Sequence, residues 1–169
     1  MANSTDLWVG GPNNTPKRVT ISSMALAATL TAPGVHLTGA GAAIVGGHVY
    51  FGDGGGGYGS GYHEVHKFSI STNAYVSSLN TGDSQGGGSY ESVIQMIGDG
   101  TSLWVLTNVQ SFLNWTTLER IDAAAGKTVH SIFSFDSGLA NNGAKMAKVG
   151  DALFVRCNHN LHRIATNLG

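Results

Sequence analysis

Residues 100–108 read GTSLWVLTN, and residues 118–132 read LERIDAAAGKTVHSI. Within the second stretch, TLERID (117–122) alternates apolar and polar residues, which is the period of a β-strand. Gly-Asp-Gly at 98–100 and Ala-Ala-Gly at 124–126 are small-residue breaks of the kind that suit tight hairpins. These stretches therefore predict antiparallel strands joined by short turns.

The apolar segment LWV of this stretch has three counterparts in the chain. The four segments are LWV (7–9), VYF (49–51), LWV (103–105) and LFV (153–155). Their central aromatics are Trp8, Tyr50, Trp104 and Phe154. Large aromatic side chains that recur at one position of a repeat are typical of a core between repeating units. We therefore expect these four residues to form the repeat core.

A basic residue followed by an apolar one marks a second repeated segment, and a third segment precedes three of the four aromatic segments. The aligned bases are Arg18, Lys67, Arg120 and Arg163. The third segment reads AAIVGG (42–47), SVIQMIGDG (92–100) and KMAKVGD (145–151). Because the bases recur at one repeat position, we interpret them as structural, in pairing or stem packing between units.

Together these segments resemble YVTN and related WD-like β-propeller repeats, although the G-H…W-D signature of true WD repeats is absent. The resemblance covers almost the whole chain and implies a fold rather than a function. We expect an all-β, β-propeller-like domain over 1–169, with about three and a half four-stranded antiparallel blades. The repeat units are approximately 6–33, 41–82, 91–135 and 144–169.

The expected units hold three, four, four and three strands, because residues 1–5 are too short for a first strand and the chain ends within its fourth unit. Open strand edges favour pairing with another chain. Completion by a second chain is the favoured interpretation. The alternatives are a piece of a longer protein and an irregular four-bladed ring that closes on itself.

The glycine-rich run DGGGGYGSGY (53–62) fits the pattern G-x-G-x-x-G, but a strand follows it where a dinucleotide site needs a helix. We interpret it as a long connection between strands. In a propeller, the connections between the second and third strands of a blade and those between successive blades emerge on one face, and these are the long connections of this chain. This loop face carries Asp53, Tyr58, Tyr62, Tyr90, Phe112 and Trp115. It is predicted either to bind a saccharide or protein ligand or to pack on neighbouring subunits.

The composition limits the classes of partner and the location that we expect. Only 11% of the 169 residues are charged and the net charge is −1, so we expect no nucleic-acid partner. No apolar run is long enough to predict membrane insertion, and no signal peptide is evident. A surface rich in Gly, Ser, Thr and Asn favours a chain made in the cytoplasm whose final location is a virion or the extracellular space.

No catalytic set is recognisable. The chain has no G-x-S-x-G, and its single cysteine, Cys157, is interpreted as an apolar filler within a strand. His63 and His66 would point to opposite faces of a strand, so neither a metal nor another cofactor is expected.

The leading hypothesis is a non-enzymatic structural module that self-assembles through open blade edges. It would be a bacteriophage tail, fibre or decoration protein, or part of an extracellular filament, with copies of itself or a neighbouring structural protein as partners. The alternative is a carbohydrate- or receptor-binding propeller that uses the loop face. The third is a fragment of a propeller enzyme.

Overall fold

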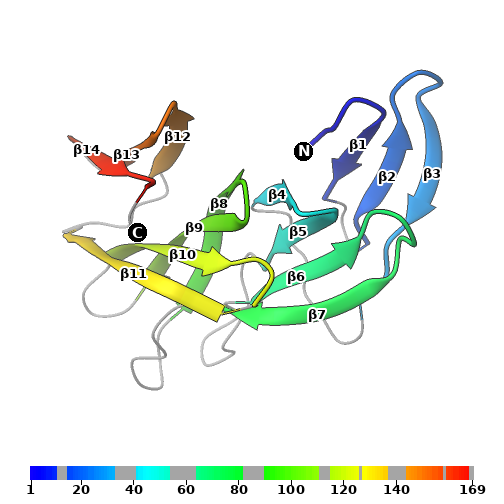
Figure 1. Ribbon diagram of the computed structural model, residues 1–169. Coiled ribbons are helices and arrows are strands. Elements are labelled where there is room, and N and C mark those ends of the chain that lie inside the picture. The colour runs from blue at the N-terminus through cyan, green and yellow to red at the C-terminus, as the bar shows by residue number, and fades with distance from the viewer. Residues whose placement is uncertain are drawn as a thin grey trace.

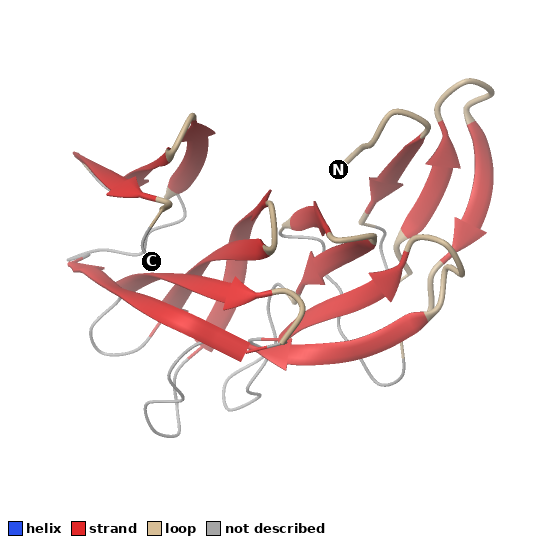
Figure 2. Cartoon of the chain, in the orientation of Figure 1, coloured by secondary structure: helices blue, strands red, loops and turns tan. Residues whose placement is uncertain are grey.

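The computed structural model is built from β-strands (Figures 1 and 2). It describes residues 1–10, 15–32, 41–53, 64–81, 90–110, 115–125, 127–136, 144–157 and 159–167. Over these residues the chain forms four antiparallel sheets and no helix. The prediction of an all-β chain with units of three, four, four and three strands is confirmed for this part of the chain.

Each sheet is drawn from one consecutive stretch of chain. Sheet 1 contains β1 (Asp6–Val9), β2 (Lys17–Thr20) and β3 (Ala25–Thr29). Sheet 2 contains β4 (Ala42–Val45), β5 (His48–Gly52), β6 (Glu64–Ser69) and β7 (Tyr75–Asn80). Sheet 3 contains β8 (Tyr90–Asp99), β9 (Ser102–Gln110), β10 (Trp115–Asp122) and β11 (Lys127–Asp136). Sheet 4 contains β12 (Lys145–Val149), β13 (Ala152–Cys157) and β14 (Asn160–Ala165). Strands that follow one another in the chain are neighbours in each sheet.

The start of the chain forms no separate strand, as expected, but it does pair with β1. Residues 1–5 are too short for a full strand, yet Ala2 forms an antiparallel bridge with Leu7 of β1. The Met1 amino group donates to the Trp8 carbonyl at 2.9 Å, and the Trp8 N–H donates to the Met1 carbonyl at 2.6 Å. The edge of sheet 1 at β1 is therefore partly paired by residues 1 and 2.

Two kinds of turn repeat along the chain. Gly46 and Gly47, which join β4 to β5, have φ of 54° and 76°, the pair of positive values that a tight hairpin of this hand requires. Met24 and Asn73 occupy the same place in the turns before β3 and β7, with φ of 52° and 58°. Asparagine tolerates this backbone conformation better than methionine does.

The four sheets follow one another along an arc, with sheets 1 and 4 standing apart at its two ends (Figure 1). The first strands of neighbouring sheets make the contacts: β4 lies against β8, and β8 lies against β12. In each of the two middle sheets, the last strand (β7 or β11) runs along the outer side of the arc.

Three hydrophobic clusters fill the spaces between consecutive sheets. We call the side of a sheet that faces the preceding sheet its front face, and the other side its back face. Trp8 of the sheet 1 back face packs with Val49, Phe51 and Phe68 of the sheet 2 front face. The same arrangement joins Tyr50 to Leu103, Val105 and Ile121 of sheet 3. It recurs where Trp104 meets Leu153 and Val155 of sheet 4. Each sheet thus covers the central aromatic of the one before it.

Sheets 2 and 3 approach each other closely at Gly98. A Cβ atom there would collide with the Ile44 carbonyl oxygen and would lie 2.6 Å from Val45 Cγ2. Replacing Gly98 by alanine is therefore expected to lower the free energy of unfolding by about 1–3 kcal/mol, since backbone must move to admit the methyl group.

Denaturant unfolding measures this change, and Gly100→Asn is the matched control. Gly100 has φ of 58°, and a Cβ atom added there would meet no other atom within 4 Å. Asparagine accepts that conformation, as Asn73 does, so the control should lose less than about 1 kcal/mol. Equal losses in the two variants would contradict a close approach at Gly98.

Candidate functional site

In each of the first three sheets, a basic side chain lies beside the buried central aromatic. Each central aromatic lies directly opposite a base on the next strand: Trp8 pairs with Arg18, Tyr50 with Lys67, and Trp104 with Arg120. The cationic groups lie 5.6, 5.9 and 5.8 Å from the respective ring centroids, within the range of cation–π attraction. These bases therefore stabilise the sheets in which they lie.

The same bases also reach the next sheet. Arg18 Nη1 donates to the Ile70 carbonyl at 3.2 Å and to Asn73 Oδ1 at 3.0 Å in sheet 2. Lys67 Nζ donates to the Ala123 carbonyl at 3.1 Å in sheet 3. Ile70 and Ala123 are equivalent, since each follows the base of its own sheet by three residues. One hydrogen bond thus recurs from sheet 1 to sheet 2 and from sheet 2 to sheet 3.

The acceptor of this bond is held in the same way in every sheet. The residue three places after the base donates its backbone N–H to the turn between the first two strands of its sheet, or to the residues just before β1. The pairs are Ile21 to Thr5, Ile70 to Gly47, Ala123 to Thr101 and Thr166 to Asp151, at 2.9, 3.1, 2.9 and 2.9 Å. Sheets 1 and 4 therefore hold this backbone group as the middle sheets do.

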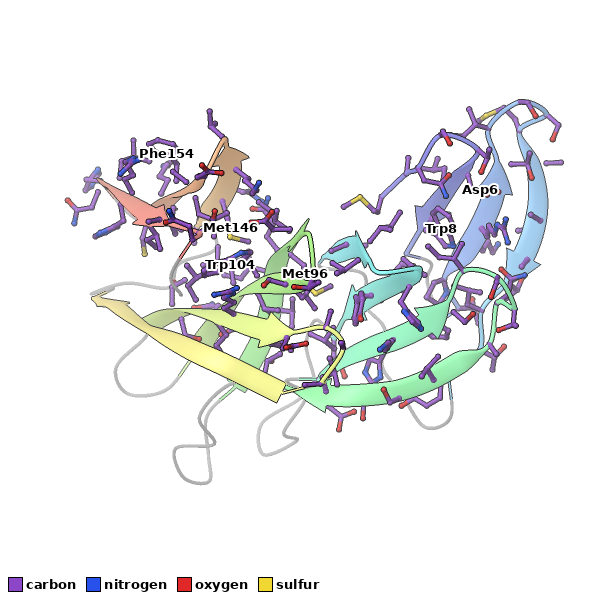
Figure 3. The ribbon with its side chains drawn as sticks, viewed as in Figure 1. Asp6, Trp8, Met96, Trp104, Met146 and Phe154 are labelled. Carbon is purple, nitrogen blue, oxygen red and sulfur yellow. The ribbon has the colours of Figure 1, made fainter. Side chains whose placement is uncertain are left out.

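Arg18 also has a carboxylate partner. Its Nη2 donates to Asp6 Oδ2 at 2.8 Å, and the Thr5 hydroxyl donates to the same oxygen at 2.8 Å. The guanidinium, and then the hydroxyl, hold the pKa of Asp6 below its usual range. The same bond raises the pKa of Arg18. Asp6 and Trp8 both lie in sheet 1 (Figure 3).

The back face of sheet 4 exposes groups that the middle sheets bury. Phe154 is half-buried, whereas Trp8, Tyr50 and Trp104 are at most 1% exposed. Leu161 is 68% exposed, whereas its equivalents Val65 and Leu118 are fully buried. Figure 3 shows Phe154 on the side of sheet 4 away from Trp104 and Met146. This face has the composition of a covered face but no described sheet against it.

The front face of sheet 1 also exposes residues whose equivalents in the other sheets are buried. Val9 is 44% exposed, whereas its equivalents Phe51, Val105 and Val155 are at most 1% exposed. Leu26, which aligns with Tyr75, is 58% exposed. Each end of the arc therefore exposes residues whose equivalents are buried in the contacts between sheets.

A buried histidine lies between sheets 1 and 2. His66 is fully buried on the front face of sheet 2, its ring centroid is 6.3 Å from that of Tyr75, and its Nε2 lies 3.8 Å from Glu64 Oε2. Burial lowers the pKa of His66 below its ordinary value of 6.5, and the Glu64 carboxylate opposes this shift.

The free energy of unfolding is therefore expected to decrease as the pH falls below about 6.5, because the unfolded chain then binds a proton at His66 that the folded chain excludes. The unfolding of His66→Gln across this range should show a flatter pH dependence. His159→Gln removes an exposed histidine and is the control. If His66→Gln retained the full slope, another group would be responsible. Loss of the Asp6 contribution falls in a separate window, below about 3.8.

A small cavity lies beside Tyr50 and Lys67, between sheets 2 and 3. Its volume is about 160 Å³, and His48, Thr101 and Ala123 also line it. The Tyr50 hydroxyl donates to the Ala123 carbonyl at 3.3 Å, and burial raises the pKa of Tyr50. Ligand pockets usually measure about 300 Å³ or more, so this space suits at most a few water molecules.

Neither a metal centre nor a membrane helix is found in the part of the chain that the structure describes. Within these residues no three His, Cys, Asp or Glu side chains come together as metal ligands. The described residues also contain no helix with the length and apolarity needed to cross a membrane.

The residues expected on the loop face have different placements. Asp53 is 2% exposed; its N–H donates to the Glu64 carbonyl, and its own carbonyl accepts from Val93 of sheet 3. Tyr90 and Trp115 begin β8 and β10 and pair with adjacent residues of β9, so both lie at one end of sheet 3. Tyr58, Tyr62 and Phe112 lie outside the described residues.

One important contact had no signal in the sequence. The side-chain amide of Gln95, on β8, donates from Nε2 to the Met146 carbonyl at 2.7 Å and accepts from the Met146 N–H at 2.8 Å. Gln95 thereby pairs sheet 3 with β12 of sheet 4 as a neighbouring strand would. A single glutamine in an apolar strand does not indicate this role before the two strands are placed side by side.

No family model matches the chain, and none of the curated proteins matches it. Among solved structures, the chain is similar to hydrazine synthase of Kuenenia stuttgartiensis, with 10% sequence identity and a TM-score of 0.48. The match covers 90% of this chain and 52% of that one, so the chain spans about half of its length. At this TM-score the similarity carries no argument about function.

Proposed function

We propose that this chain is a non-enzymatic structural module, a propeller-like arc of blades that associates with further copies of itself through its two end sheets. The proposal combines the repeat resemblance of the sequence with the arc of antiparallel sheets. Each middle sheet is covered on both faces, whereas one face of each end sheet has no described sheet against it.

The distribution of exposed apolar side chains carries this proposal. Among the side chains whose exposure the structure describes, eight large hydrophobic ones are exposed, and seven of these belong to sheets 1 and 4 or to the residues beside their strands. They are Met1, Val9, Ile21, Met24, Leu26, Val149 and Leu161. Concentrated apolar surface marks interaction sites more often than scattered residues do.

Light scattering of the purified chain across a wide range of concentration tests the proposal. The expected mass rises from that of one chain, 17.5 kDa, to that of a defined oligomer or filament. A mass of one chain at every concentration would overturn self-association.

The proposed setting is a virion or an extracellular filament. The support is compositional: few charges and many Gly, Ser, Thr and Asn residues. Detection of the protein in purified particles or filaments, by mass spectrometry, is the expected result. Its presence in the host cytosol alone would contradict this setting.

A second candidate is glycan or receptor binding at the loop face. The observation that favours it is the placement of Tyr90 and Trp115 at one end of sheet 3, beside the long connections. Binding on a glycan array that is lost in Trp115→Ala would support this function. An array without signal at high protein concentration would count against it.

A further inference from the structure

We infer that the back face of sheet 4 in one copy packs on the front face of sheet 1 in the next copy, in the manner of the contacts between sheets within the chain. This inference rests on the proposed self-association and names its geometry. It differs from pairing of open strand edges, because faces rather than backbone edges would meet.

The chain already contains this contact three times. In each case a central aromatic on a back face packs against apolar residues at equivalent positions of the following front face. Sheet 4 supplies the aromatic, Phe154, and sheet 1 supplies the apolar residues at the equivalent positions: Leu7, Val9 and Val19. The two surfaces are thus variants of surfaces that already fit each other.

The polar groups of this contact are also present on the two end sheets. Arg163 is exposed and pairs directly opposite Phe154, as Arg18 does with Trp8 and Lys67 with Tyr50. The acceptor that it would meet is the carbonyl of Ile21, the equivalent of Ile70 and Ala123. The N–H of Ile21 is held by the Thr5 carbonyl at 2.9 Å, as in the other sheets. Donor and acceptor of a third inter-sheet bond of this kind are therefore present at opposite ends of the arc.

One charged residue, Lys17, lies on the sheet 1 front face and would face a basic surface in this contact. Lys17 occupies the position at which His66 and Glu119 are buried in sheets 2 and 3. The strands of the sheet 4 back face carry Lys145, Arg156 and Arg163, so both surfaces are basic. Association should therefore strengthen as salt screens this repulsion, whereas a contact held by opposite charges would weaken.

A contact between two different faces is heterologous, so it closes into a ring or continues as a filament. Sheets 1 and 4 stand at the two ends of the arc, which leaves both faces accessible at once (Figure 1). Two copies would supply eight sheets, which lies within the usual range of propeller blades, about four to eight.

Complementation of two variants tests the inference. Val9→Lys disables the sheet 1 face, and Leu161→Lys disables the sheet 4 face. Each places a charge opposite a basic surface, at a side chain that is exposed in the single chain. Each variant replaces an apolar contact of the proposed interface by a charge, so each alone should associate at least tenfold more weakly than the wild type.

An equimolar mixture of the two variants retains one intact pair of faces, so light scattering should show a complex of two chains that neither variant forms alone. Recovery in the mixture also shows that both variants are folded. Val76→Lys, at an exposed position of sheet 2, should assemble as the wild type does.

The failures of the inference and of the proposed function are distinguishable. If the wild type assembles but the mixture stays monomeric, or if either variant assembles normally, the head-to-tail contact is wrong and self-association stands. A symmetric contact between two sheet 1 faces would be lost in Val9→Lys, kept in Leu161→Lys and not restored by mixing. A wild type that is always a single chain, or assembly that weakens with salt, overturns the inference, and the former also overturns the proposed function.

Discussion

Replacing Trp104 by alanine is expected to lower the free energy of unfolding by about 3–5 kcal/mol, the cost of emptying a large, fully buried site. Trp104 is 0% exposed and packs with Leu153 and Val155 between sheets 3 and 4 (Figure 3). Sheet 4 has no other described sheet against it. Denaturant unfolding, followed by circular dichroism, measures the loss.

Two variants at related positions are controls for this result. Trp104→Phe should lower the free energy of unfolding much less than Trp104→Ala does. An aromatic ring still fills most of the site, and the indole Nε1 makes no hydrogen bond within the described residues. Phe154→Ala removes the equivalent aromatic of sheet 4, which is half-buried, and should cost about half as much as Trp104→Ala under conditions that keep the chain monomeric. An equal loss at positions 104 and 154 would contradict the assignment of Phe154 to an uncovered face.

Replacing Gln95 by leucine is expected to cost about 2–4 kcal/mol. The substitution preserves most of the volume but leaves both the N–H and the carbonyl of Met146 without the amide that now pairs with them. Each unsatisfied group costs about 1–3 kcal/mol when it is buried. A loss below about 1 kcal/mol would show that water replaces the amide at this junction.

Gln95→Glu gives a sharper test of the same contact. At neutral pH the carboxylate can accept from the Met146 N–H but cannot donate to the Met146 carbonyl, so the variant should be less stable than the wild type. A protonated carboxyl group both donates and accepts, as the amide does. The pKa of the introduced carboxyl group is therefore expected to be higher in the folded than in the unfolded chain, and the difference in stability from the wild type should shrink as the pH falls toward about 4.

The sequence predicts the strands well because local patterns determine them. Alternation in TLERID and the turn glycines at 46 and 47 depend on neighbouring residues alone, and the structure has β10 and a tight hairpin there. The bases opposite the aromatics could also be anticipated as structural, because a residue that recurs in every unit serves what the units share. Arg18 and Lys67 do link consecutive sheets.

Features that depend on how two sheets meet were not predictable from the sequence. Gln95 and Gly98 have no counterpart in the other units, and their roles follow from a partner strand that lies far away in sequence. Asp53 was expected on a loop face because glycines follow it, yet its backbone bonds to both Glu64 and Val93 and so holds it in the interior. The direction of a chain segment after a strand is a tertiary property that composition does not report.

The sheets contact their neighbours in order along the arc, and this gives the molecule the thermodynamics of a linear array. Its stability should then be close to a sum of terms for single sheets and for nearest-neighbour junctions. Amide protons of sheets 1 and 4, which have one junction each, should exchange with solvent sooner than those of sheets 2 and 3, which have two. Capture of an end sheet by another copy would turn an outer unit into an inner one, so assembly would slow exchange first at the two ends of the array.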